Sequence, residues 1–305
     1  MKKAFIQLHI AVLLAGFTAI LGKLIDLNEG MLVIYRMSIS ALVLGLILVF
    51  RKSFEKINFA SVIKTFGVGG IVAMHWVTFY GSIKYSNVSV SVTCLSAIGF
   101  FTSFFEPLIK RRKVVPVEVL LGLFAIAGIY LIFNFYPEYE TGIIFGVISA
   151  MLASLFPIYN KDLLKKFSPK VVTFYEMLGG FICLCFIVPV YLNFFPANYF
   201  IPTMTDLFWL LVLAIFCTVL SFILSLNALK YISPFTTNLT YNLEPVYSII
   251  LAFILFKENK FLGKGFYFGF ALILLAISLQ MMREWKMRRL QKKEQTATLQ
   301  VDDIT

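Results

Sequence analysis

Residues 207–229, LFWLLVLAIFCTVLSFILSLNAL, run for 23 residues without a charged side chain. A helix needs about 20 mainly apolar residues to cross the roughly 30 Å hydrocarbon core of a bilayer. Lipid offers no partners to backbone polar groups, so such a stretch must close its own hydrogen bonds as a helix. Residues 65–83 and 119–137 are equally free of charge. The sequence therefore predicts a membrane protein with several transmembrane helices.

In the rest of the chain, the apolar segments between successive charged residues predict nine more spans, which makes ten in total. Lys2 and Lys3 precede the first apolar run, as in a signal peptide, but the run is long and has no clear small-x-small cleavage site. We therefore keep this run as the first helix. The predicted spans lie near residues 5–25, 30–50, 62–83, 87–109, 117–135, 141–160, 171–192, 206–229, 234–256 and 265–282.

The composition of the whole chain agrees with this prediction. Of its 305 residues, 60% are hydrophobic and 14% are charged, whereas soluble domains usually carry about 25% charged residues. The net charge of +11 raises the question of nucleic-acid binding. However, the basic residues lie in short runs between apolar segments, which is the pattern of cytoplasmic loops. We expect the chain to contact a lipid bilayer and no nucleic acid.

Lysine and arginine are distributed unequally between the two sides of the predicted bundle. The side that holds both termini carries Lys2, Lys3, Arg51, Lys52, Lys56, Lys64, Lys110, Arg111, Arg112, Lys113, Lys161, Lys165, Lys166, Lys170, Lys230 and six residues of the tail. The other side carries Lys23, Lys84, Lys257, Lys260 and Lys264. By the positive-inside rule, both termini are expected in the cytoplasm, with the chain in the cytoplasmic (inner) membrane.

The two halves of the chain resemble each other. Lys84 closes the third predicted span and Lys230 closes the eighth, an offset of 146 residues. Arg36 in span two corresponds to Glu176 in span seven, at an offset of 140 residues. A unit of five spans ends on the opposite side of the membrane, so its second copy must be inverted, as in many secondary transporters. The predicted fold is an all-α integral membrane protein with inverted five-helix repeats at residues 1–137 and 138–282 and a polar cytoplasmic tail at 283–305.

Residues 242–246, NLEPV, precede an apolar stretch that ends at Lys257-Glu258. This pattern resembles the second-half signature of the drug/metabolite transporter superfamily, EamA-type permeases, and the resemblance covers roughly residues 1–282. The five-plus-five arrangement and Arg36 in span two are also similar to that family. The resemblance implies a central cavity lined by spans one, three, four, six, eight and nine. It implies that spans five and ten are a scaffold or a dimer surface, so the protein is a monomer or a homodimer.

Glu244 is the first candidate for binding a substrate or exchanging a proton. An ionisable group at bilayer depth costs about 3 kcal/mol or more on insertion scales, so it usually faces protein or water. Thr237, Glu244 and Ser248 recur at helical spacing on one polar face. A structural carboxylate tied to another span is the alternative. The further candidates for this wall are Tyr241, Asn238 and Asn242.

His75 lies on a second polar stripe, in span three, and Ser221 is its equivalent in span eight. Histidine titrates near neutral pH and can relay protons, although a hydrogen-bonded packing role is the alternative. Trp76, Tyr80 and Ser96 complete the predicted binding residues.

Arg36, Glu176, Pro157 and Pro245 are the predicted gating residues. Arg36 and Glu176 each lie about six residues into a span, so either could gate the pathway or extend to the membrane surface. A structural role is favoured for Glu176. Proline removes a backbone donor and can break or loosen a helix, and a packing kink is the alternative at Pro157.

These features predict a secondary transporter that moves small metabolites by alternating access, through efflux or exchange. Amino acids, amines and drug-like compounds are the candidate substrates, and protons are a candidate coupling ion. An intramembrane enzyme or a membrane assembly factor is the alternative. The sequence contains no Walker A motif, no metal-ligand spacing and no Ser–His pair at sensible spacing, so we expect no cofactor, metal or catalytic residue.

Overall fold

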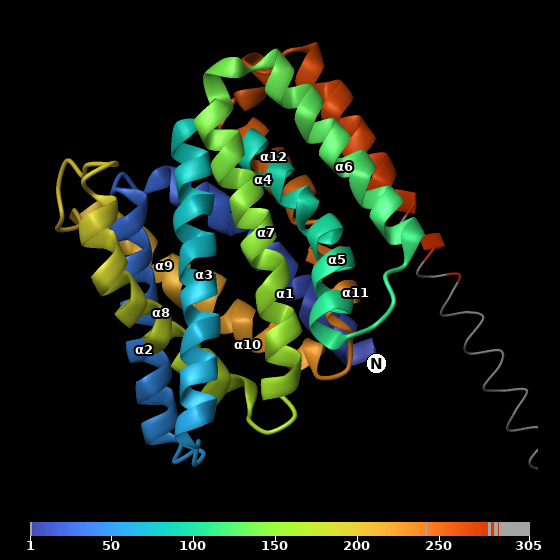
Figure 1. Ribbon diagram of the computed structural model, residues 1–305. Helices are drawn as coiled ribbons and strands as arrows, with labels where there is room; N and C mark the ends of the chain where they lie inside the picture. The colour runs from blue at the N-terminus through green and yellow to red at the C-terminus, as the bar shows by residue number, and fades with distance from the viewer. Residues whose placement is uncertain (1, 242, 280–281, 284–285, 287–305) are drawn as a thin grey trace, which may run out of the picture.

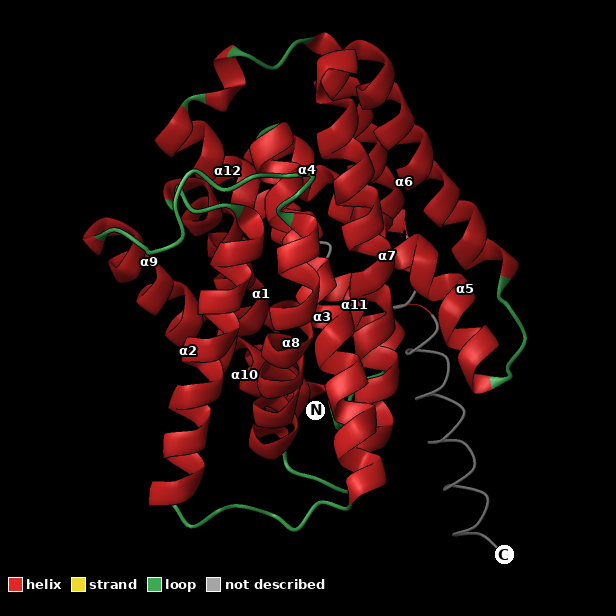
Figure 2. Ribbon diagram, turned by 60° about the vertical axis from the view of Figure 1, so that its left-hand side comes forward, coloured by secondary structure: helices red, strands yellow, loops and turns green. Residues whose placement is uncertain are grey.

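The structure is a computed structural model that describes every residue except 1, 242, 280–281, 284–285 and 287–305. All regular elements in the described part are helical, and it contains no strand (Figure 2). Nine helices there are long and apolar enough to cross a membrane, and Lys264–Leu279 is a shorter apolar helix. The predicted all-α membrane fold is confirmed. The predicted tail lies outside the described residues except for Arg283 and Lys286.

The first half contains five spans, one of them broken. Asn28, Asn58 and Asn87 each accept a hydrogen bond from a backbone N–H of the helix that follows, which fixes three of the helix starts. The elements are α1 (Lys2–Leu24), α2 (Glu29–Phe50), α3 (Phe59–Tyr85), α4 (Val88–Cys94), the 3₁₀ turn η1 (Leu95–Ala97), α5 (Ile98–Lys110) and α6 (Pro116–Phe135). Span four is thus α4, η1 and α5 together, with a break that the sequence did not predict.

The second half follows the 3₁₀ turn η2 (Pro137–Tyr139) and also contains broken spans. The elements are α7 (Glu140–Leu163), α8 (Pro169–Tyr191), α9 (Met204–Ala214), the π-helical segment η3 (Ile215–Leu220), α10 (Ser221–Leu229), α11 (Pro234–Tyr241), α12 (Glu244–Phe256) and the 3₁₀ turn η4 (Glu258–Lys260). Span eight is α9, η3 and α10, and span nine is α11 and α12. The helix Lys264–Leu279 is the tenth predicted span.

The packing of spans four and nine, two of the three broken spans, shows that the repeats are inverted. Helix α4 packs against α12, and α5 packs against α11. Because α4 precedes α5 whereas α11 precedes α12, the fourth spans of the two repeats run antiparallel. Inverted repeats have this arrangement. The exact limits of the repeats stay a prediction.

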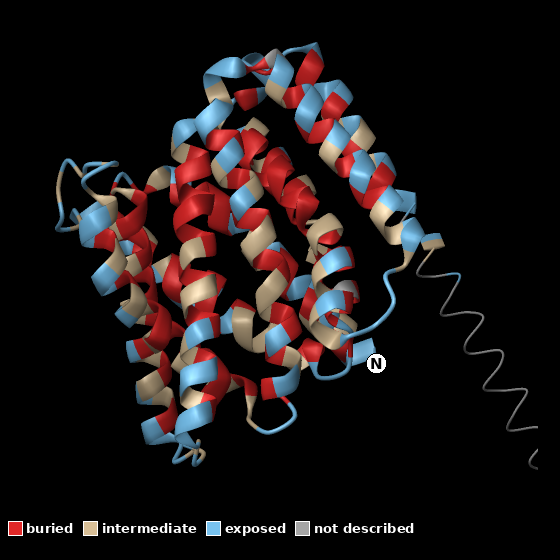
Figure 3. Ribbon diagram, in the orientation of Figure 1, coloured by how far each residue is buried: buried red, intermediate tan, exposed pale blue. Residues whose placement is uncertain are grey.

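Helix α3 packs against α2, α7 and α8 (Figure 1). We call the end of the bundle that holds Lys2, Lys110 and Leu229 the N-terminal end, and the end that holds Leu24 and Tyr85 the opposite end. Buried residues dominate α4 and the upper part of α3 in Figure 3, whereas the lower part of α3 carries more exposed residues. The densest packing is therefore in the half toward the opposite end.

Helix α6 and Lys264–Leu279 form a peripheral pair beside the main body (Figure 1). A Cβ on Gly128 of α6 would lie 2.6 Å from the carbonyl oxygen of Gly269, and a Cβ on Gly269 would lie 2.6 Å from that of Gly128. The glycines let the two backbones touch, as small residues do between membrane helices.

Candidate functional site

A cavity lies in the middle of the bundle, and the space between its walls, open solvent included, is about 800 Å³. Its walls come from spans one, three, four, six, eight and nine, which the resemblance implied, and also from span two. Among the described residues, none from α6 or Lys264–Leu279 lines it. Eight of the predicted site residues meet there: Arg36, His75, Trp76, Pro157, Ser221, Asn238, Tyr241 and Glu244.

The cavity reaches toward the N-terminal end of the bundle. Ser225 and Leu229 line it from the last turns of α10, and Thr237 lines it from the first turn of α11. Toward the opposite end the helices are in close contact. A Cβ on Gly22 of α1 would lie 2.2 Å from the ring of Tyr80 on α3. At this contact, α1 and α3 are packed too closely for any side chain larger than glycine at position 22.

The carboxylate of Glu258 holds two spans together at the opposite end through hydrogen bonds. It accepts hydrogen bonds from the backbone N–H of Val88 at 3.1 Å and from the N–H and hydroxyl of Ser89 at 2.9 and 2.6 Å. A negative charge at the N-terminus of a helix is favourable. Glu258 thereby joins the start of span four to the loop after span nine. Its repeat equivalent is Arg112, which has the opposite charge and cannot accept such bonds.

A polar cluster at the same end holds the loop before α9. Asp206 accepts hydrogen bonds from the Tyr199 hydroxyl at 2.9 Å and from the backbone N–H of Asp26 at 3.0 Å. Burial and the neighbouring carboxylate raise the pKa of Tyr199 to about 12, so its hydroxyl stays protonated and donates at neutral pH.

The guanidinium of Arg36 is buried at the cavity wall, and the residue is 1% exposed. Its Nη1 donates to the Tyr80 hydroxyl at 2.6 Å, Nε to the Thr218 hydroxyl at 2.7 Å, and Nη2 to the Cys217 carbonyl at 3.3 Å. Its Cζ also lies 3.5 Å from the ring centroid of Trp76, a cation–π contact. The suggestion that Arg36 extends to the membrane surface is therefore wrong.

Two of these contacts depend on the π-helical segment η3. Thr218 and Cys217 lie inside it, and the Thr218 hydroxyl also donates to the carbonyl of Leu213 at 3.0 Å, five residues earlier. Short π-helical turns inside α-helices are frequent at functional sites. Here the wider turn presents a hydroxyl and a carbonyl to one guanidinium.

Glu244 faces the cavity at a helix interruption. Helix α11 ends at Tyr241 and α12 begins at Glu244, and Pro245 occupies the first turn of α12, where its missing N–H costs least. The predicted break at Pro245 is present, and Pro245 itself does not line the cavity. Asn242 lies outside the described residues.

Arg36 and Glu244 line one cavity without forming an ion pair with each other. They are close enough to interact electrostatically. A guanidinium has five donors, and the three bonds given above leave two N–H groups of Arg36 for other partners. Within the part of the chain that the structure describes, the ion pairs are Lys110–Asp162, Lys165–Asp162 and Arg283–Glu118.

His75 joins α3 to α7 at the edge of the cavity. Its Nδ1 lies 2.8 Å from the Ser149 hydroxyl and 3.0 Å from the Ser149 carbonyl oxygen. Its ring also packs on Phe79 and Phe156, with centroids 6.1 and 6.0 Å away. These contacts fit the packing alternative for His75. The sequence did not predict the pairing with Ser149, because the two residues lie 74 positions apart.

Three further predicted residues line the cavity and also tie helices together. The Asn238 amide donates to the Thr102 hydroxyl at 2.8 Å, and the Ser221 hydroxyl donates to the Ala11 carbonyl at 3.1 Å. The Tyr241 hydroxyl interacts with the side chain of Ser221 across the gap between α11 and α10.

The remaining predicted residues lie elsewhere or behave differently. Tyr80 lies behind the wall and holds Arg36, whereas Ser96 is buried in η1 away from the cavity. Glu176 is fully buried on α8 and does not line the cavity. Pro157 does line it, but α7 continues through Pro157 to Leu163, so the predicted helix break there is wrong.

Sequence reasoning missed the apolar part of the wall. Phe222 packs against Trp76 with centroids 5.5 Å apart and against Phe156 at 6.1 Å. Within an apolar span, nothing in the sequence separates a phenylalanine that faces lipid from one that faces a cavity. The missed residues that line the cavity include Thr18, Phe79, Phe156, Cys217 and Phe222.

Comparison with known proteins agrees with this architecture. The sequence pattern of the EamA-like transporter family matches residues 2–134 and again residues 140–282. An uncharacterized transporter of Archaeoglobus fulgidus is 24% identical over 194 residues, which are 62% of this chain and 67% of that protein. A solved structure described as "Crystal structure of protein" has a TM-score of 0.63 at 16% identity, over 91% of this chain and 96% of the other, and thus shares the fold. Because two copies of the family pattern cover almost the entire chain, the protein belongs to the EamA-like transporter family and is a multi-pass membrane transporter.

Proposed function

We propose that this protein is a secondary transporter of small zwitterionic metabolites, with amino acids as the main class. The observation that carries the proposal is the pair of opposite charges, Arg36 and Glu244, on one cavity without an ion pair between them. An amino acid carries an ammonium group that suits Glu244 and a carboxylate that suits the unused N–H groups of Arg36. The aromatic rings of Trp76, Phe156 and Phe222 would receive its side chain.

Alternating access follows from the inverted repeats. The cavity reaches toward the N-terminal end, and close helix contacts and Glu258 fasten the opposite end. If the two repeats exchange conformations, the opposite end opens and the N-terminal end closes around the same residues. In this proposal the binding residues would be accessible from both sides in turn.

The direction of transport follows from the orientation that we propose. The excess of lysine and arginine at the N-terminal end favours a cytoplasmic location for that end, in the cytoplasmic membrane. In the present conformation the cavity then approaches the cytoplasm. Efflux or exchange of cytoplasmic amino acids is consistent with this arrangement, and no covalent chemistry is required.

An intramembrane enzyme is the competing function, and the contact between His75 and Ser149 is the feature that comes nearest to supporting it. A serine activated by a histidine can act as a nucleophile. However, Ser149 is fully buried and does not line the cavity, and its hydroxyl lies 3.0 Å from the backbone carbonyl oxygen of His75. A substrate in the cavity would not reach it. An assembly factor without transport activity would not need two opposed charges on a cavity.

The test is counterflow in proteoliposomes that contain the purified full-length protein. The probes are radiolabelled phenylalanine, phenethylamine, which lacks the carboxylate, and 3-phenylpropionate, which lacks the ammonium group. Each lost charge-assisted hydrogen bond is worth roughly 1.5–3 kcal/mol, so we expect each analogue to exchange at least about tenfold more weakly than phenylalanine.

Substitution of the carboxylate provides the matched control. In Glu244→Gln, the preference for phenylalanine over 3-phenylpropionate should fall, because the partner of the ammonium group is gone. Saturable exchange of phenethylamine alone would contradict the zwitterion proposal and favour an amine transporter. Absence of exchange across acidic, basic, aliphatic and aromatic amino acids would contradict amino-acid transport altogether.

A further inference from the structure

The carboxyl of Glu176 lies in an enclosed site behind the cavity wall, next to the contact between α8 and α3. The two backbones touch here, since a Cβ on Gly69 would lie 2.1 Å from the carbonyl oxygen of Glu176. Asn160, on α7, faces the carboxyl. Both residues are 0% exposed, and neither lines the cavity. A carboxyl and an amide are thus isolated together at membrane depth.

Apart from each other, these two side chains have no polar partner in the described part of the chain. Among the described residues, no partner makes a hydrogen bond of normal geometry to either oxygen of Glu176 or to either polar side-chain atom of Asn160. An ionised carboxylate in such a place is strongly unfavourable unless a cation or several donors compensate it. Something must therefore neutralise Glu176.

The neighbouring charged groups are engaged elsewhere. Helix α8 packs against α2, α3 and α10, and Asn160 brings α7 to the same place. Helix α10 has no titratable side chain, and Tyr175 of α8 packs on Phe66. Several titratable groups on these helices are bonded or exposed. Lys64 and Tyr159 are exposed, and Arg36 binds Tyr80, Thr218 and Cys217. His75 contacts Ser149, Lys161 binds backbone carbonyls, and Asp162 pairs with Lys110 and Lys165.

The chemistry of the pair suits a proton better than a metal cation. Glu176 and Asn160 supply three side-chain oxygens, whereas Ca²⁺ usually takes about 6–8 oxygen ligands. A proton removes the charge of the carboxyl directly. The neutral acid can then donate its O–H to the Asn160 carbonyl oxygen, and the amide can donate back to the acid.

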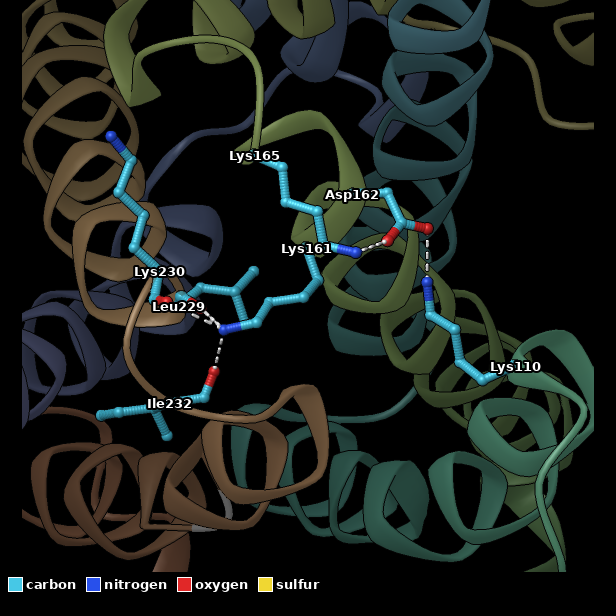
Figure 4. A network of polar contacts seen from close by, with 7 residues as sticks. All are labelled: Lys110, Lys161, Asp162, Lys165, Leu229, Lys230 and Ile232. Carbon is cyan, nitrogen blue, oxygen red and sulfur yellow. Dashed lines mark hydrogen bonds and ion pairs between the residues drawn. The ribbon is translucent and has the colours of Figure 1, made fainter.

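Asn160 lies in the last turn of α7, which binds several spans at once (Figure 4). Asp162 accepts a hydrogen bond from Lys110 of α5 at 2.5 Å. One turn earlier, Pro157 lines the cavity and lacks the N–H that would bond within the helix. Lys161 Nζ donates to the carbonyl oxygen of Leu229, the last residue of α10. It also donates to the carbonyl oxygens of Lys230 at 3.1 Å and Ile232 at 2.8 Å, which follow that helix. Movement of this turn would therefore act on Glu176 and on the cavity together.

We propose that Glu176 and Asn160 form the proton-binding site of the transport cycle, separate from the substrate groups Arg36 and Glu244. The carboxyl holds its proton while the last turn of α7 is closed. When that turn moves and admits solvent, the O–H bond breaks, the proton passes to water, and the carboxylate is hydrated. The inference rests on the proposed transport function and adds to it the site of the coupling ion.

The first test needs no substrate. Infrared difference spectra of the purified full-length protein between acidic and alkaline buffer detect the C=O stretch of protonated carboxyl groups. We expect one titrating component of the wild-type signal to be lost in Glu176→Gln and kept in Glu244→Gln, the control from the cavity. Glutamine has the shape of the neutral acid, so the fold should be retained. A difference spectrum of Glu176→Gln identical to that of the wild type would overturn the proposal.

The second test measures coupling with phenylalanine in proteoliposomes. Glu176→Gln should exchange phenylalanine at a rate close to that of the wild type but should lose accumulation driven by a pH gradient, whereas Glu176→Asp should retain part of it. Accumulation by Glu176→Gln equal to that of the wild type would overturn the proton site and leave the transport proposal intact. If the wild type exchanges no phenylalanine, the transport proposal fails, and the infrared result alone decides whether Glu176 binds a proton.

Discussion

The two ends of the bundle are closed by different kinds of contact. At the opposite end, helices meet at glycines such as Gly22, and the buried carboxylate of Glu258 binds the start of α4. At the N-terminal end, lysine and aspartate side chains reach across from one helix end to another (Figure 4), and the partly exposed carboxylate of Glu55 accepts hydrogen bonds from the backbone N–H of Ser168. Buried contacts of the first kind are costly to break, and exposed ion pairs of the second kind are weak. The comparison indicates that the N-terminal end opens more easily than the opposite end.

The largest effect is expected from Glu258→Ala. It removes three hydrogen bonds to a carboxylate that is 6% exposed, so we expect a loss of about 3 kcal/mol in the free energy of unfolding. Buried Cys94, at the end of α4, should then react with a membrane-impermeant maleimide. Thermal unfolding in detergent and thiol labelling measure the two results. Glu138→Ala, at an exposed glutamate in η2, is the control. An unchanged melting temperature with Cys94 still protected would show that Glu258 does not fasten this end.

A smaller effect is expected from Gly22→Ala. The new Cβ would lie 2.2 Å from the Tyr80 ring, so the ring must move and its 2.6 Å bond to Arg36 is disturbed. Overpacking of this kind costs about 1–3 kcal/mol. The matched control is Gly67→Ala, because a Cβ on Gly67 meets nothing within 4 Å, and the change should be neutral or stabilise the helix by up to about 1 kcal/mol. Equal melting temperatures for the two variants would remove the glycine contact from the comparison.

The smallest effect is expected from Asp162→Asn at the N-terminal end. The Asp162 side chain is 55% exposed, and exposed ion pairs contribute about 0–1 kcal/mol. The melting temperature should therefore change little, and the small difference should shrink further in high salt. A loss as large as that of Glu258→Ala would show that both ends are fastened with equal strength and would contradict the comparison.

Most of the fold could be predicted from the sequence, because lipid imposes a length and a polarity on every span. All ten predicted spans lie within three residues of the helices in the structure. The interruption before Pro245 was also predictable, because proline lacks a backbone donor. The break at η1 and the π-helical segment η3 were not, since both depend on contacts with helices far away in the sequence.

Only the charged residues of the candidate site could be predicted directly from the sequence. Arg36 and Glu244 are recognisable in sequence because ionisable groups inside spans are rare. Their roles were less accessible. The partners of Arg36 on span eight are 181 and 182 residues away. Glu176, like Glu244 an acidic residue inside an apolar span, lies outside the cavity. Only the three-dimensional packing separates these two carboxyls.

The π-helical segment η3 has a consequence for how this chain tolerates insertions and deletions. A π turn holds one residue more than an α turn. Deleting one residue between Ile215 and Leu220 would therefore convert this turn into an ordinary α turn, with Ser221 and Ser225 still facing the cavity. The wider turn that presents the Thr218 hydroxyl and the Cys217 carbonyl to Arg36 would be lost. Deleting a residue from the regular α-helical part of α10 would instead rotate everything after it by about 100°.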